Sequence, residues 1–249
     1  MSTSKIWATS EDGKTEYVSL TANRLSETLQ TLKESFFKFE NVCKAVGLSK
    51  NDEAVDELDD FVIDIAKHGV SVIAIDKETN KVIGVSLNKI QHKDTSCTEF
   101  YADYAKRAQH AETIAILDFL TEMEGLLDPF TPYNADCLLE SVFLGVQPEY
   151  VGRGIGTTLF KITLDLASLL YKGQNVKISL EESSLPLEPI PQIVTSILTT
   201  FKTQQITKRL GFDLIKKIYF KDVYFNGRSY GSLLRDYNLY FTLECKKIE

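Results

Sequence analysis

One stretch near the middle of the chain, FLGVQPEYVGRGIGTTLF, limits the fold more than any other. An apolar run meets a proline turn, and three alternating glycines follow at Gly152, Gly154 and Gly156. A helical pattern begins at once, with apolar residues on one face at Ile155, Leu159, Ile162, Leu166 and Leu169. The stretch therefore predicts a strand, a turn and a helix whose first backbone N–H groups favour a phosphate or similar anion.

The spacing of these glycines excludes two common phosphate-binding motifs. Counting from Gly152, Thr157 takes the last position of the G-x-G-x-x-G dinucleotide fingerprint. A P-loop needs Gly-Lys-Ser/Thr after four further residues, and the lysine is missing. A purely structural glycine turn before a core helix is the other interpretation of the segment.

The remaining patterns predict an α+β fold. Runs rich in β-formers predict strands at 15–20, 70–76, 81–90, 137–146, 175–181, 212–223 and 239–244. Apolar residues at helical spacing predict helices from Leu25, from Val55, over 112–127, from Ile155 and before KRLGF at 208–212. We expect a single domain over 1–249 with a mixed, mostly antiparallel sheet of about seven strands, flanked by helices, and one strand–helix–strand unit around the glycines.

Composition limits the partners. Lys and Arg number 28 against 35 Asp and Glu, so the formal net charge is −7. No basic stripe is available for a nucleic-acid backbone, and we expect no nucleic-acid partner. No segment approaches the roughly 18 apolar residues of a membrane span, and no leader-like pattern opens the chain. We therefore expect a cytoplasmic protein with no membrane partner.

Cysteines and histidines are too dispersed for a recognisable metal site. The four cysteines, Cys43, Cys97, Cys137 and Cys245, show no CxxC spacing, so free buried thiols are expected. The three histidines, His68, His92 and His110, are equally scattered, and no metal is expected.

The stretch VQPEYVGRGIG resembles the pyrophosphate-binding loop of the GNAT superfamily of N-acyltransferases, with the pattern Arg/Gln-x-x-Gly-x-Gly/Ala after a strand and V-x-P. Gly154 and Gly156 match the small residues, whereas Val151 stands where Arg or Gln is usual. This departure implies weaker tuning of coenzyme A binding. The resemblance implies a sheet splayed at an acyl-CoA site, with cosubstrate contacts from Leu144, Gly145, Val146, Val151, Gly152, Arg153, Gly154, Ile155, Gly156 and Thr157.

A second stretch, SFFKFENVCKAVGL, is similar to the FF-x-x-E-P-L-x-x-x-L-G-L segment of the insect arylalkylamine N-acetyltransferases. Asn41 replaces the proline of that pattern. The resemblance implies that Glu40 is the general base that takes the proton of an alkylammonium, whose pKa is about 10.4 in solution. From the residues alone, the favoured interpretation of Glu40 is a surface carboxylate beside a core Phe39, and the motif match reverses this preference.

The same group has two hydroxyl residues four apart on the helix before LGF. Counting back gives Thr199 and Thr203 as candidates to protonate the leaving thiolate, although threonines there can simply bond to a helix carbonyl. In the resembled fold, N–H groups of 144–146 point at the developing oxyanion, and a bulge at Gly145 is the plainer interpretation. Phe36, Phe37 and Phe39 could form an aromatic floor for the amine or belong to the core.

The resemblance thus predicts an acetyl-CoA-dependent N-acetyltransferase for a small primary amine, an arylalkylamine, acting by direct attack in a ternary complex. Alternatives are a polyamine or agmatine acceptor, a longer acyl-CoA donor, and a non-catalytic acyl-CoA-binding relative. A structural protein that uses the glycine turn only for packing is a further alternative. The proline-rich loop at 185–192 and the insert at 92–110 are candidate pocket walls.

Overall fold

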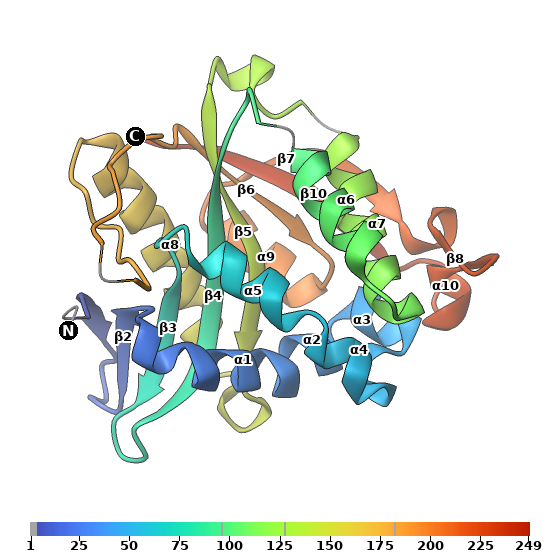
Figure 1. The fold of residues 1–249 in the computed structure, drawn as a ribbon, viewed down its shortest axis with the longest axis horizontal. Coiled ribbons are helices and arrows are strands. Elements are labelled where there is room, and N and C mark those ends of the chain that lie inside the picture. The colour runs from blue at the N-terminus through green and yellow to red at the C-terminus, as the bar shows by residue number, and fades with distance from the viewer. Residues whose placement is uncertain (1–3, 96, 127, 182) are drawn as a thin grey trace.

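The computed structural model describes residues 4–95, 97–126, 128–181 and 183–249. In these ranges eight strands form one mixed sheet in the order β1-β2-β3-β4-β5-β6-β10-β7 (Figure 1). They are β1 (Ile6–Thr9), β2 (Thr15–Ser19), β3 (Val72–Asp76), β4 (Lys81–His92), β5 (Cys137–Val146), β6 (Ile193–Leu198), β7 (Asp213–Tyr219) and β10 (Tyr240–Lys247); β8 (Tyr224–Phe225) and β9 (Arg228–Ser229) form a separate hairpin. The expected α+β class is confirmed, with eight strands in the main sheet rather than about seven.

Helices cover both faces of the sheet. They are α1 (Leu25–Glu34), α2 (Phe36–Phe39), α3 (Asn41–Val46), α4 (Asp52–Asp56), α5 (Asp59–Ala66), α6 (Cys97–Arg107), α7 (Ala111–Gly125), α8 (Ile155–Tyr171), α9 (Phe201–Arg209) and α10 (Tyr230–Leu233). One apolar core joins the sheet to the helices from α1 to α7, and a second joins its other face to α8. Figure 1 shows α1 and α5 in front of the strands and α8 behind them.

The parallel partner of β5 is not the segment that the sequence suggests. The run 175–181 predicts a strand, but it is irregular and at best half-buried. Ile193 and Val194 of β6 are instead fully buried beside β5. Strand preference depends on burial between neighbours, and here 193–198 occupies the central position. The short β1 and the helix α6 were not expected either.

The sheet splits between β5 and β6. These strands pair in parallel from Leu138 to Glu140, whereas β6 continues beside β10 to Leu198. Every other pair of neighbouring strands is antiparallel. The expected splay is therefore present, and it opens just after Glu140.

The irregularity in β5 lies at a different residue from the one expected. In the β4–β5 ladder, Phe143 pairs with Leu87 and Ser141 with Asn88, so Val142 is the extra residue. Gly145 pairs regularly with Val85, and the expected bulge at Gly145 is wrong. A bulge re-aims nearby side chains and increases the local twist, and this one lies directly beside the split.

Candidate active site

A cavity of about 30 Å³ lies where β5 and β6 separate. Helices α2, α3 and α7 supply part of its wall, and β5 and β6 supply the rest. Most of the wall is apolar, with side chains that include Phe36, Ile116, Leu120, Phe143 and Ile197. Its oxygen-bearing side chains belong to Glu40, Glu140, Ser141 and Thr199. Small-molecule sites combine apolar walls with a few converging polar groups in the same way, but at volumes of roughly 300–1,000 Å³, so this cavity would have to widen to hold an amine.

Glu40 reaches the cavity because it caps a helix. It has extended backbone before α3, and its two carboxylate oxygens accept the N–H groups of Val42 and Cys43 at 2.9 Å each. The side chain is 6% exposed. Capping satisfies N–H groups at a helix start that have no partner inside the helix. The alternative of a surface carboxylate is wrong, since Glu40 is buried in the cavity wall.

Cys43 lies beside Glu40 in the same wall. Burial raises the pKa of its thiol well above the usual range, and the nearby Glu40 carboxylate raises it further. A thiol held in its protonated form is a poor nucleophile. The chemistry of the cavity therefore centres on carboxylates and hydroxyls.

The three phenylalanines occupy different surroundings. Phe36 lines the cavity, with its ring centroid 4.6 Å from that of Phe143. Phe37 is 1% exposed and packs edge-on against both of these rings. Phe39 is 51% exposed and is not part of the cavity wall. Of the expected aromatic floor, Phe36 borders the cavity and Phe37 supports it from the core.

The two candidate threonines are also separated. Thr199 follows β6 and precedes the helix, lines the cavity, and accepts a 2.6 Å hydrogen bond at its carbonyl from the Asn41 side chain. Thr203 is on α9, where its hydroxyl donates to the Thr200 carbonyl at 2.9 Å. The expectation that both lie on one helix is wrong, because Thr200 caps α9 and Thr199 stands before it.

The glycine segment has the geometry expected of an anion-binding helix start. Gly152 and Gly154 have φ of 92° and 80°, values that favour glycine. Gly154 is the N-cap of α8 and, within the described chain, receives no side-chain cap. A Cβ at either position would meet nothing within 4 Å. The exposed N-terminus of α8 is therefore open to a ligand.

Residues around these glycines anchor the loop. Gly156 packs where a Cβ would lie 3.7 Å from Val146 and 3.9 Å from Leu144, so the helix start sits against the end of β5. Ile155 is 2% exposed and belongs to the core. Arg153 lies over the Tyr150 ring at 4.8 Å. Val151 is 48% exposed.

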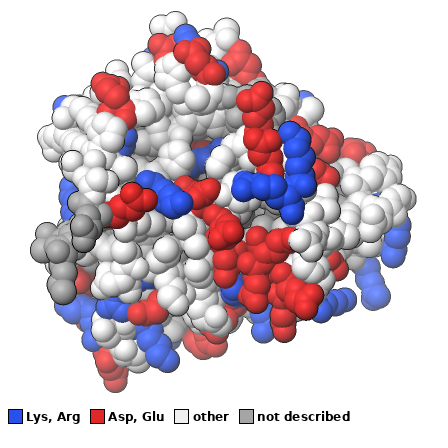
Figure 2. All heavy atoms as spheres, viewed as in Figure 1, with Lys and Arg blue, Asp and Glu red and all other residues white. Residues whose placement is uncertain are grey.

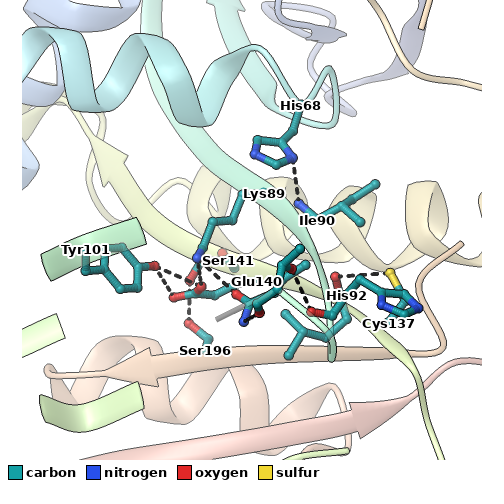
Figure 3. A network of polar contacts seen from close by, with 12 residues as sticks. His68, Lys89, Ile90, His92, Tyr101, Cys137, Glu140, Ser141 and Ser196 are labelled. Carbon is teal, nitrogen blue, oxygen red and sulfur yellow. Dashed lines mark hydrogen bonds and ion pairs between the residues drawn. The ribbon is translucent and has the colours of Figure 1, made fainter. Parts of the chain in front are cut away.

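A buried ionic network that the sequence interpretation missed adjoins the cavity (Figure 3). Lys89 of β4 and Glu140 of β5 are cross-strand partners, with Nζ 3.1 Å from Oε2. The Tyr101 hydroxyl of α6 lies 2.8 and 2.9 Å from the two carboxylate oxygens. The sequence does contain a signal for this ion pair: Lys89 lies inside the apolar run KVIGVSLNKI, and Glu140 lies inside CLLESVFLGV. Buried charged residues are usually paired, so opposite charges in two apolar strands indicate an ion pair between them.

The two segments expected to form pocket walls lie in different places. The proline-rich loop lines a different cleft, of about 470 Å³, through Glu188, Pro189 and Ile190. That cleft lies at the start of β5, beside Cys137, rather than at the split. The insert at 92–110 forms α6, which supplies Tyr101 behind the cavity, while the following helix α7 supplies the wall itself.

Other features of the surface are simpler. Acidic side chains gather over α4 and α5 (Figure 2). Cys43, Cys137 and Cys245 are buried free thiols, and the side chain of Cys97 lies outside the described part. No helix in the described ranges is long and apolar enough to cross a membrane. Among those same residues no cluster of His, Cys, Asp and Glu could hold a metal ion.

Comparison with known proteins rests on structure. No known family profile and no curated protein sequence matches the chain. The structure of arylalkylamine N-acetyltransferase 2 from Aedes aegypti is similar, with TM-score 0.75 and 20% identity over 94% of this chain and 99% of that one. Structures of an agmatine N-acetyltransferase (TM-score 0.72, 15% identity, 94% and 99% coverage) and of Arabidopsis thaliana NAA60 with acetyl-CoA (0.51, 15%, 94% and 98%) are also similar. The chain therefore has the fold of the GNAT N-acyltransferases, as its glycine segment suggested.

Proposed function

We propose that this protein transfers an acetyl group from acetyl-CoA to the nitrogen of a small primary amine, and that its acceptor is an arylalkylamine. The observation that carries the proposal is the position of Glu40, a buried carboxylate in the wall of an apolar cavity at the split in the sheet. The open N-terminus of α8 offers a site for the pyrophosphate of the cosubstrate. The structural likeness to amine N-acetyltransferases supports the same class.

In this proposal Glu40 takes a proton from the ammonium of the acceptor. A neutral amine is needed because its lone pair forms the new N–C bond, and Glu40 has acceptor capacity beyond the two backbone N–H groups that it already binds. The carboxylate therefore receives the proton before attack, directly or through a water molecule. In this proposal the cavity widens on binding, and the aryl group packs against the apolar wall that includes Phe36 and Phe143.

Attack on the thioester carbonyl places negative charge on its oxygen. Alternate backbone groups of β5 beyond Glu140 face the split rather than a neighbouring strand, and in this proposal N–H groups of 144–146 stabilise the oxyanion. Collapse of the tetrahedral intermediate breaks the C–S bond, and the thiolate leaves with a proton. Thr199 is the better placed of the two threonines to donate it, because it lines the cavity.

The first experiment measures thiol release from acetyl-CoA with tryptamine, dopamine, agmatine and spermidine as separate acceptors. We expect release with an aryl amine, and a loss of release in Glu40→Gln but not in the control Glu16→Gln on β2. Faster release with agmatine or spermidine would replace the arylalkylamine assignment by the polyamine alternative. Silence with every amine, together with a thermal shift by coenzyme A, would support a binding-only protein.

A further inference from the structure

Glu40 and Glu140 both line one cavity, but the surroundings of their carboxylates differ. Backbone N–H groups hold Glu40, whereas a lysine ammonium faces Glu140. The side chains of Lys89 and Glu140 are 4% and 2% exposed, and their pairing at 3.1 Å takes place away from bulk water. The negative charge of Glu140 is therefore neutralised inside the protein, and that of Glu40 remains for a ligand.

Several contacts keep Lys89 in place. Its Nζ lies 4.2 Å from the centre of the Tyr101 ring and 4.9 Å from that of Phe100, and it donates to Gln91 at 3.1 Å. Figure 3 shows Lys89 and Tyr101 both directed at the carboxylate of Glu140. A buried ammonium with these partners does not leave for solvent without breaking all of them.

We propose that the Lys89–Glu140 pair makes this cavity selective for amines with one positive charge, by occupying the carboxylate that would otherwise bind the far cation of a diamine. The proposal deepens, and rests on, the proposed acetyltransferase function. A monoamine brings one ammonium to Glu40 and an apolar body to the apolar wall. A diamine brings a second charge that finds no further uncompensated carboxylate among the described residues of that wall, so binding costs the desolvation of an ion without a partner.

The test compares hexylamine with cadaverine, two linear molecules of equal length. The far end is a methyl group in hexylamine and a second ammonium in cadaverine. Calorimetry gives the dissociation constant of each amine, and thiol release gives each kcat/KM. In the wild type we expect hexylamine to be preferred. Lys89→Met and Lys89→Gln both remove the cation that lies 3.1 Å from Glu140, and either should shift the preference toward cadaverine by about tenfold or more, as for one desolvated charge pair.

Two further variants separate charge from damage. Lys89→Arg keeps the cation and should keep the wild-type preference. Lys89→Met/Glu140→Gln removes both charges and should cancel the gain for cadaverine. General destabilisation would weaken both amines together and would not produce this pattern. An unchanged preference in both Lys89→Met and Lys89→Gln, or binding of neither amine by any variant, would overturn the proposal.

Measuring tryptamine acetylation by the wild type in parallel shows whether a negative result concerns the selectivity or the proposed acetyltransferase function. If tryptamine is acetylated and the preference does not move, the function stands and the role of Lys89 falls. If no amine is acetylated but the binding preference moves as expected, the selectivity stands and the proposed reaction falls.

Discussion

A Cβ atom on Gly145 would lie 2.5 Å from the Oγ of Ser35, at the junction between α1 and α2. Ser35 is buried, and its hydroxyl donates to the Thr31 carbonyl at 2.5 Å. The close approach brings the chain that leads to Glu40 directly onto the β5 segment 144–146. Glycine is needed here because of contact rather than of backbone conformation, since Gly145 is not among the residues with positive φ.

Gly145→Ala should therefore lower the free energy of unfolding by about 1–3 kcal/mol through overpacking. Adding Ser35→Ala removes the oxygen that the new methyl group meets. The double variant should recover part of the lost stability. Urea unfolding of the wild type, Gly145→Ala, Ser35→Ala and the double variant would measure this in a double-mutant cycle. Strictly additive losses would mean that Ser35 is not the obstacle.

Glu40→Gln should lower kcat strongly while the affinity for acetyl-CoA changes little, because the amide oxygen can still accept one of the two N–H groups at the start of α3 but the side chain cannot take up a proton. Raising the pH toward the amine pKa, about 10.4 in solution, should restore part of the rate by supplying neutral amine. Stopped-flow thiol release from pH 7 to 10 would measure this. A rate for Glu40→Gln that is flat over the range would remove the base assignment.

Glu40→Ala should also cost stability, since it removes the cap of α3. Loss of a helix cap costs about 0.5–2 kcal/mol. Comparing thermal unfolding of Glu40→Ala with that of Glu40→Gln separates the structural role of the side chain from its chemistry. Equal stability of all three proteins would show that the cap contributes nothing.

Gly154→Val should weaken acetyl-CoA binding, and the other end of the same helix provides a matched control. Gly154 and Gly173 have φ of 80° and 81°, and a Cβ at either would meet nothing within 4 Å. Each valine substitution should cost about 1–2 kcal/mol or more of stability from backbone strain. Calorimetry with acetyl-CoA should show a loss for Gly154→Val and not for Gly173→Val; equal affinities would reject the loop as the binding site.

His68 should make the protein less stable in mild acid. Burial lowers its pKa from 6.5 to about 4, with the charge of Lys89 adding to the effect. Between these values the unfolded chain binds a proton that the folded protein does not, so the stabilisation is complete above pH 6.5 and is lost as the pH falls toward 4. The contribution is about 1–3 kcal/mol.

Urea unfolding of the wild type and of His68→Gln between pH 7.5 and 4.5 would measure this dependence. Glutamine keeps a side-chain acceptor for the Ile90 N–H that His68 binds at 3.3 Å. The wild type should lose more stability over the range than the variant. Parallel curves of unfolding free energy against pH for the two proteins would mean that the pKa of His68 is not lowered in the folded protein.

Local patterns in the sequence determined the strand–turn–helix around Gly152 and Gly154, because consecutive residues set the positive φ values and the helical face of α8. They also determined the helix end at KRLGF, where Gly211 has φ of 73°. A motif of neighbouring residues singled out Glu40 as a candidate, and its cap of α3 is equally local. None of these features needs a distant partner.

Tertiary structure alone decided which run pairs with β5, where the bulge falls, and which side chains share a cavity. The strand 193–198 displaced 175–181 because strand pairing depends on burial between neighbours far apart in sequence. Lys89 and Glu140 are neutralised only because the β4–β5 register places them opposite each other. Such pairings depend on the packing of the whole sheet, and no window of adjacent residues contains that information.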